Sequence, residues 1–272
     1  MKNLFYLLLA FVLFSCSEKT LGTKEANNGS RALKVMSYNI HIANPPSKKA
    51  GYTDLPAIAQ VIKREKPDLV ALQEVDAYTK RSGSDSHQAK DLARMAGMHY
   101  FFAKAMDRSG GEYGVAVLSR YPITESKAIR LPLPQSNLGG ENRAAALIVV
   151  EINKQKLIFV GTHFDHKSDE NRSYQANQLL SQIAEYQQYP LIVAGDFNMA
   201  SDNKTFAVFN KDFNKGCVNC PFTFSATKPW TTIDYILLNK KAEQIFNIKG
   251  YRTIDEKYAS DHLPLVADLE FK

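Results

Sequence analysis

Hydrophobic residues in this chain fall in short runs that are typical of β-strands, beginning at Leu33 and recurring to the C-terminus. The runs are rich in β-branched and aromatic residues. They are LKVMSYNI, DLVALQEV, HYFFAKA, YGVAVLS, AALIVVEI, KLIFVGTH, PLIVAGDF, TIDYILL and PLVADLEF. Because so many strands have few helices between them, the pattern predicts two packed β-sheets, mostly antiparallel within each, with helices outside.

Three of the intervening segments have the spacing of helices. Residues 54–65 begin at Asp54, a capping residue, and place apolar side chains on one face until Pro67 ends the helix. A second helix is expected after Ser86 and a longer one over about 168–189. The 272 residues, 44% of them hydrophobic, suffice for one large domain.

The first 16 residues have the pattern of an export signal. Lys2 precedes an unbroken apolar run over 4–14, and Cys16 follows shortly after it. A run of this length rises only about 16 Å as a helix, against roughly 30 Å for the hydrocarbon core, so it does not span a membrane. The sequence LFSC resembles a bacterial lipobox, whose cysteine becomes the lipidated first residue. An ordinary signal peptide with an incidental cysteine is the alternative.

The next segment is polar and has no hydrophobic period. Residues 17–31 therefore predict a flexible tether, and residues 32–272 the folded domain. We expect an exported monomer, bound to the cell envelope through a lipid on Cys16, on the periplasmic or surface side.

Charge and cysteines add less to the prediction. A net charge of +6 and a pI near 9.0 suit an anionic partner, but an excess of lysine also keeps proteins soluble. Cys217 and Cys220 form a single CxxC. With no second pair to complete a zinc site, and in an exported protein, a disulfide is favoured over a metal knuckle or two free thiols.

Polar residues follow several of the apolar runs at or just past their C-terminal ends. They are Asn39, Glu74, His163, Asp196 and Asn198. Strand ends that meet at one rim of a sheet bring such side chains together. We therefore expect them to form one site.

A second group of acidic residues points to the same site. Asp234 lies inside an otherwise apolar strand, where a carboxylate is costly unless it is paired, and His262 is the candidate partner. Clustering Glu74, Asp196, Asp234 and Asp261 would cost several kcal/mol without a cation. Their hard oxygen ligands, with the amide of Asn39, suit Mg²⁺ or Mn²⁺ better than zinc.

Seven motifs in order resemble the endonuclease/exonuclease/phosphatase superfamily. They are SYNIH, LQEV, YGVAVLSRYPI, GTHFDH, AGDFN, TIDYILL and SDHLPL, and they cover about residues 34–270. The resemblance implies the DNase-like fold, a four-layered α/β sandwich in which two packed mixed β-sheets are flanked by helices. It also implies a Mg²⁺-dependent phosphoric ester hydrolase, with Glu74 as the main metal ligand, aided by Asn39 and Asp261.

The resemblance also implies catalytic roles. Asp196 would orient or activate the attacking water, and Asn198 would stabilise the phosphoryl oxygens. His262, polarised by Asp234, would neutralise charge developing on the phosphate, and His163 would contact the phosphate from the other side.

Four further residues are predicted to bind substrate. Arg81 and Arg143 lie in predicted loops, where a guanidinium can hold a phosphate, although each can also be a solvated surface arginine. Asn142 precedes Arg143, and His166 is the last residue of the GTHFDH motif. The sequence leaves the role of His41 open.

The motifs are specific for the chemistry and not for the substrate. A nuclease-like phosphoesterase is placed first, because the protein is basic. The alternatives are a phospholipid or sphingomyelin phosphodiesterase, which the anchor favours, and an inositol- or sugar-phosphate phosphatase, which the short loops favour. A catalytically inactive surface-binding lipoprotein is the non-enzyme alternative.

Overall fold

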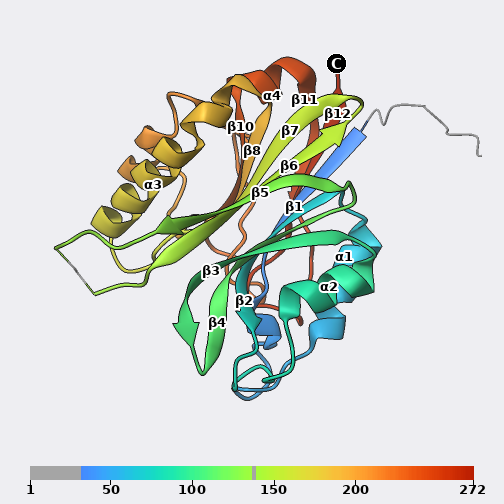
Figure 1. The fold of residues 1–272 in the computed structure, drawn as a ribbon, viewed down its shortest axis with the longest axis vertical. Helices are drawn as coiled ribbons and strands as arrows, with labels where there is room; N and C mark the ends of the chain where they lie inside the picture. Colours follow the sequence, from blue (N-terminus) through green and yellow to red (C-terminus); the bar gives the residue numbers. More distant parts are fainter. Residues whose placement is uncertain (1–31, 137–138) are drawn as a thin grey trace, which may run out of the picture.

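The computed structural model describes residues 32–136 and 139–272, which fold into two six-stranded β-sheets packed face to face (Figure 1). The predicted signal segment and tether, residues 1–16 and 17–31, lie outside the described residues.

The first sheet has the strand order β11-β12-β1-β2-β4-β3. The strand β1 is parallel to β2, and every other neighbouring pair is antiparallel. Its members are β1 (Ala32–Asn39), β2 (Leu69–Ala77), β3 (His99–Arg108), β4 (Gly111–Ser119), β11 (Phe246–Thr253) and β12 (Leu265–Phe271).

The second sheet has the order β5-β6-β7-β8-β10-β9, and only β7 and β8 are parallel among its described pairs. Its members are β5 (Ile123–Leu131), β6 (Arg143–Ile152), β7 (Gln155–His163), β8 (Leu191–Asp196), β9 (Phe213–Lys215) and β10 (Asp234–Asn239). Both sheets are thus mixed and mostly antiparallel, as predicted.

Helices cover the outer faces of both sheets, with α1 and α2 on the first and α3 on the second (Figure 1). The helices are α1 (Leu55–Glu65), α2 (Gln88–Ala96), α3 (Asp169–Ile183) and α4 (Lys240–Ile245), and the 3-10 turns are η1 (His41–Ala43), η2 (Ala184–Gln188) and η3 (Lys204–Val208). The side chain of Asp54 caps α1 by accepting a hydrogen bond from the N–H of Ala57. The four-layered α/β sandwich is confirmed.

The core consists of three apolar layers, one between the sheets and one beneath each helical layer. Strand β7 contributes to two of them: Phe159 packs between the sheets and Ile158 packs under α3. Strands buried on both faces are apolar at consecutive positions, which explains why the sequence shows continuous runs. Among the described helices, none has the length and apolar character needed to cross a bilayer.

Candidate active site

The predicted site residues gather at one rim of the sandwich, because both parallel strand pairs end there. In the second sheet, His163 at the end of β7 pairs with Asp196 at the end of β8, and Asp234 at the start of β10 pairs with Asp196. In the first sheet, Asn39 ends β1 beside Gln73 of β2. A hydrogen bond of 3.0 Å from Nδ2 of Asn39 to Oδ2 of Asp196 joins the two sheets.

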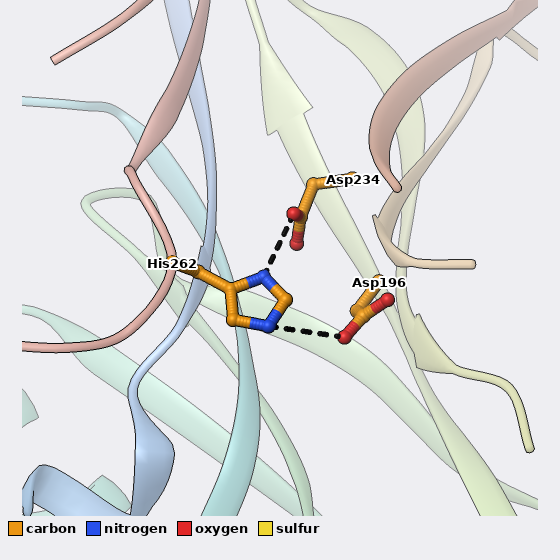
Figure 2. Close-up of side chains that lie close together, drawn as sticks. All are labelled: Asp196, Asp234 and His262. Atoms are coloured by element: carbon orange, nitrogen blue, oxygen red, sulfur yellow. Dashed lines mark hydrogen bonds and ion pairs between the residues drawn. The ribbon is translucent and has the colours of Figure 1, made fainter. Parts of the chain in front are cut away.

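His262 lies between two carboxylates at the centre of this rim (Figure 2). Its Nδ1 is 2.9 Å from Oδ2 of Asp234, and its Nε2 is 3.7 Å from Oδ2 of Asp196. All three side chains are buried. The pairing of Asp234 with His262 agrees with the sequence prediction.

Burial and neighbouring charge act on these groups in different directions. Burial would lower the pKa of His262, but Asp234, with Asp196 and Asp261, outweighs it and raises that pKa. Burial, then the charge of Asp234, raises the pKa of Asp196. His262 is therefore a cation that offsets the negative charge of its carboxylate neighbours.

His163 is buried on the other side of Asp196, with Nε2 3.5 Å from Oδ2. Its Nδ1 is 3.1 Å from Nη1 of Arg143. A guanidinium only donates hydrogen bonds, so Nδ1 of His163 accepts the one from Arg143. Burial and the charge of Arg143 lower the pKa of His163 well below its usual value, which keeps the ring neutral.

Asn198 lies beside His163, with Nδ2 3.0 Å from Nε2 of the ring and 3.0 Å from the carbonyl oxygen of Phe164. Its backbone N–H donates to Oδ1 of Asp196. The left-handed backbone of Asn198, with φ of 52°, suits asparagine better than most residues and makes this tight turn.

The predicted metal ligands Glu74 and Asn39 are in contact, with Oε1 of Glu74 3.3 Å from Nδ2 of Asn39. Glu74 has a φ of 55° and lies where the pairing of β2 with β4 shifts register. A β-bulge re-aims a side chain. Here the side chain of Glu74 reaches Asn39, on the neighbouring strand.

Asp261, the third predicted metal ligand, is held near Asn39 by contacts of the residues around it. Ser260 donates to the carbonyl oxygen of Asn39 at 2.7 Å, which fixes the segment before His262. Oδ1 of Asp261 lies 4.0 Å from Nδ1 of His41, whose backbone N–H donates to Oδ1 of Asn39. His41 thus lies between Asp261 and Asn39, with its Nδ1 hydrogen-bonded to the carbonyl oxygen of Asn44 at 2.7 Å.

Two sets of side chains at the rim could hold a metal ion. Ligand atoms of Asp196, Asp234 and His262 lie within 4.8 Å of one another. However, Nδ1 of His262 is already hydrogen-bonded to Asp234. The half-buried Glu74 and Asp261, with the amide oxygen of Asn39, offer hard oxygen ligands that fit Mg²⁺ or Mn²⁺, so we favour this set.

Arg143 is only 4% exposed and binds several residues of the rim. Besides His163, it donates to the hydroxyl of Tyr113 at 3.3 Å, and its Nη2 lies 3.3 Å from Nδ1 of His166 and 3.0 Å from Glu141. Arg143 was predicted in a loop just before a strand, but it is the first residue of β6 and its side chain is buried, so it is not a solvated surface arginine. Tyr113 was not among the predicted site residues, and its place at a strand end was the only signal available.

Arg81 and Asn142 are held by intramolecular contacts. Nε and Nη2 of Arg81 both donate to Asp76 at 2.8 Å, and its guanidinium lies over the ring of Tyr113. The side chain of Asn142 accepts from the N–H of Leu133. These contacts leave the predicted substrate roles of both residues as predictions.

Buried polar side chains hold the β5–β6 connection that leads to Arg143. Oδ2 of Asp165 accepts from the N–H of Glu141 at 2.8 Å, and Nε2 of Gln175, on α3, donates to the carbonyl oxygens of Leu131 and Glu141. Oε1 of Gln175 accepts from the N–H of Asp165. Helix α3 therefore fixes the backbone before Arg143.

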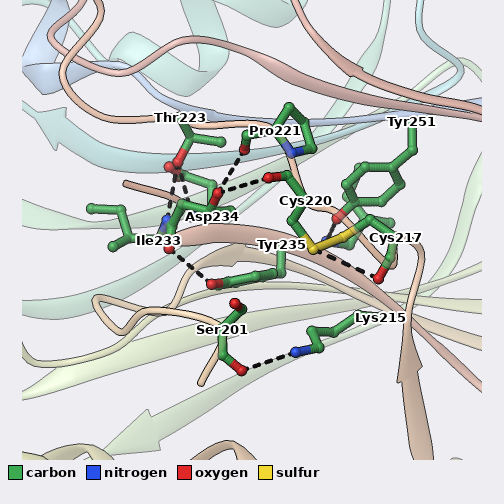
Figure 3. The surroundings of a disulfide bond; sticks show 12 residues. Ser201, Lys215, Cys217, Cys220, Pro221, Thr223, Ile233, Asp234, Tyr235 and Tyr251 are labelled. Atoms are coloured by element: carbon green, nitrogen blue, oxygen red, sulfur yellow. Dashed lines mark hydrogen bonds between the residues drawn. A yellow bond between two sulfur atoms is a disulfide. The ribbon is translucent and has the colours of Figure 1, made fainter. Parts of the chain in front are cut away.

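A disulfide joins Cys217 and Cys220, as predicted, in the loop that precedes β10 (Figure 3). Farther along this loop, the hydroxyl of Thr223 accepts from the N–H groups of Ile233 and Asp234. The loop thus helps to fix the backbone of Asp234, at the rim.

The same loop presents aromatic residues beside the rim. The ring of Phe224 lies 4.9 Å from that of His262, and Trp230 lies 6.3 Å beyond Phe224. Trp230 is 66% exposed, and Phe222 and Val218 are exposed as well. These exposed apolar residues were not predicted, because nothing in their spacing along the sequence sets them apart.

Comparison with known proteins identifies relatives with the same fold. Nocturnin of Rattus norvegicus is 25% identical to this chain in an alignment 292 residues long. The alignment covers 88% of this chain and 66% of nocturnin, so the chain spans about two thirds of that relative. A functionally unknown conserved protein from Enterococcus faecalis has a TM-score of 0.74 at 20% identity, covering 88% of this chain and 100% of its own. A mannosyl-6-phosphatase from Bacteroides thetaiotaomicron has a TM-score of 0.70 at 22% identity, with coverage of 88% and 100%.

The family model described as Endonuclease/Exonuclease/phosphatase family matches residues 36–262, which include all of the rim residues described above. This chain therefore belongs to the endonuclease/exonuclease/phosphatase family.

Proposed function

We propose that this protein hydrolyses a small phosphate ester with the help of Mg²⁺ or Mn²⁺. The observation that carries the proposal is the position of Asp196, whose Oδ2 lies 3.5 Å from Nε2 of His163 and 3.7 Å from Nε2 of His262. A carboxylate between two imidazoles can orient a water molecule for attack, while both rings face the charge that develops on the phosphate.

Each side chain has a role in this mechanism. Asp196 orients the water and accepts its proton. The cationic His262, held by Asp234, and the neutral His163 stabilise the developing negative charge. Asn198 binds a phosphoryl oxygen. A metal ion held by Glu74, Asn39 and Asp261 would supply Lewis-acid stabilisation of the phosphate.

Ion pairs near the rim favour a small ester over a nucleic acid. A polyanion needs uncompensated cations along its path. Here Arg81 is bound to Asp76, and Arg108 to Glu141. The nuclease activity that was ranked first from the sequence remains a prediction. The structural likeness to a mannosyl-6-phosphatase supports a sugar phosphate.

A phospholipid phosphodiesterase is the second candidate, favoured by the exposed apolar side chains of Val218, Phe222 and Trp230 in the loop before β10. Exposed aromatic side chains beside a catalytic site can enter a lipid interface. A lipid anchor on Cys16 would keep the protein at a membrane, which also supports this candidate.

The test is release of product from p-nitrophenyl phosphate, bis-p-nitrophenyl phosphate, mannose 6-phosphate, DNA and sphingomyelin vesicles, with Mg²⁺ or with EDTA. We expect Mg²⁺-dependent hydrolysis of the small esters, and a loss of at least about a hundredfold in kcat for Asp196→Asn and for His262→Ala.

Matched controls are the exposed residues Asp255 and His99, as Asp255→Asn and His99→Ala, which should retain activity. Activity that is insensitive to EDTA, or near-native turnover of Asp196→Asn, would overturn the proposal. Absence of hydrolysis on every ester would favour the inactive surface-binding protein, and preference for vesicles would favour the second candidate.

A further inference from the structure

A cavity of about 590 Å³ lies beside the rim, between the edge strands β3 and β5. Residues Asn142 and Arg143 form one wall, and Lys104, Met106, Asp107 and Arg130 line the remainder. Arg143 lines this cavity and also contacts His163, so the cavity lies next to the residues around Asp196. Its volume suits a group of the size of a monosaccharide.

Most of the charges around this cavity are paired within the protein. Nζ of Lys104 lies 2.7 Å from Asp107 and 3.0 Å from Glu112. Arg143 is paired with Glu141. The exposed side chain of Arg130, by contrast, makes no ion pair or hydrogen bond with any residue in the described ranges 32–136 and 139–272, although its backbone pairs with Ala144 of β6. It therefore contributes a positive charge that the protein does not neutralise.

The alternation of strand β5 explains why Arg130 faces the cavity. Ile129 and Leu131 pack into the layer under α3, and Lys127 reaches the same side, toward the carbonyl oxygen of Gln182. Neighbouring side chains of a strand point to opposite faces. Ala128 and Arg130 therefore point toward β3, and both line the cavity.

We propose that this cavity is a second, anion-binding subsite, in which Arg130 binds a phosphate, sulfate or carboxylate on the leaving group of the substrate. A guanidinium binds such groups through two parallel hydrogen bonds. The inference rests on the proposed function, because the scissile phosphate is placed beside His163 and Asp196. It adds that the preferred substrate carries two anionic groups.

The test compares glucose 1,6-bisphosphate with glucose 6-phosphate, measured as phosphate release. We expect the wild-type enzyme to have the lower KM for the bisphosphate. Arg130→Gln should raise KM for the bisphosphate about tenfold, with a much smaller effect on the monophosphate and on kcat. Lys127→Gln removes a positive charge from the opposite face of β5 and should leave KM unchanged for both sugar phosphates.

A binding measurement separates this inference from the proposed function. In Asp196→Asn, titration calorimetry with glucose 1,6-bisphosphate should show binding that Arg130→Gln weakens by a similar factor. Equal effects of Arg130→Gln on both sugar phosphates, or calorimetric binding that does not depend on Arg130, would overturn the subsite. Arg130-dependent binding without hydrolysis by the wild-type protein would overturn only the proposed function.

Discussion

At the scale of single residues, the site depends on buried charges whose partners come from distant parts of the chain. Asp234 and His262 are 28 positions apart and Asn39 and Asp196 are 157 apart, yet both pairs are hydrogen-bonded. The first pairing was predictable, because a carboxylate in an apolar strand requires a partner. The contact of Arg81 with Asp76 could not be predicted, because the sequence does not show which carboxylate will lie within reach of the guanidinium.

Asp165 gives a pH-dependent prediction at this scale. Burial opposes its charge, but hydrogen bonds from Asn171, Glu141 and Lys167 outweigh burial and lower its pKa. A depressed pKa contributes stability above the unfolded value, roughly 3.9, that is lost as pH falls through the folded value. Asp165→Asn should therefore destabilise the protein by about 1–3 kcal/mol at pH 7, and less as pH falls below 4.

Urea unfolding of Asp165→Asn and wild type at pH 7, 5, 4 and 3 measures this difference, with the exposed Asp255→Asn as control. A difference that grows toward acid pH would contradict the assignment.

At the scale of elements, helix α3 links the core to the β5–β6 connection. The sequence predicted this helix over about 168–189, and it forms as Asp169–Ile183 followed by a 3-10 turn. Its contacts with the β5–β6 connection could not be predicted, because a buried glutamine shows no preference for one loop. The bulge at Glu74 was equally hidden, since a continuous apolar strand carries no sign of it.

Gln175→Leu tests this link. It leaves the carbonyl oxygens of Leu131 and Glu141 and the N–H of Asp165 without their partner, at a cost of about 2 kcal/mol or more. Because the connection leads to Arg143, we expect KM for p-nitrophenyl phosphate to rise more than kcat falls. Gln178→Leu, on the same helix, should change neither KM nor kcat.

The measurements are steady-state kinetics and thermal unfolding of both variants. A loss of stability without any change in KM would show that Gln175 supports the fold alone.

At the scale of the whole molecule, the packing of two sheets brings four carboxylates to one rim. A cation that binds only the folded state raises stability by RT ln(1 + [L]/Kd), about 2.7 kcal/mol at a hundredfold excess over Kd. Mg²⁺ should therefore raise Tm by roughly 5 °C, and EDTA should reverse the rise.

Scanning calorimetry with and without Mg²⁺ measures this shift. Glu74→Gln should abolish it, whereas Glu151→Gln, an exposed residue of β6, should retain it. A Tm shift that survives in Glu74→Gln would remove Glu74 from the metal ligands.

The lipid anchor on Cys16 remains a prediction, because Cys16 lies outside the described residues. Cys16→Ser should move the protein from the membrane to the soluble fraction, as measured by fractionation and immunoblotting. Retention at the membrane would contradict lipidation of Cys16.

The sequence by itself predicted nine of the twelve described strands, helices α1 to α3 and the chemical nature of the site, because hydrophobic period and polar strand ends are local properties. Strands β5, β9 and β11 and helix α4 were not predicted. Tertiary structure alone decided which polar groups meet: Asp196 with Asn39 across the sheets, Arg143 with His163, and Arg130 with an open cavity. The physical reason is that hydrogen bonds and ion pairs form between groups close in space. Only the register and packing of the two sheets set those distances.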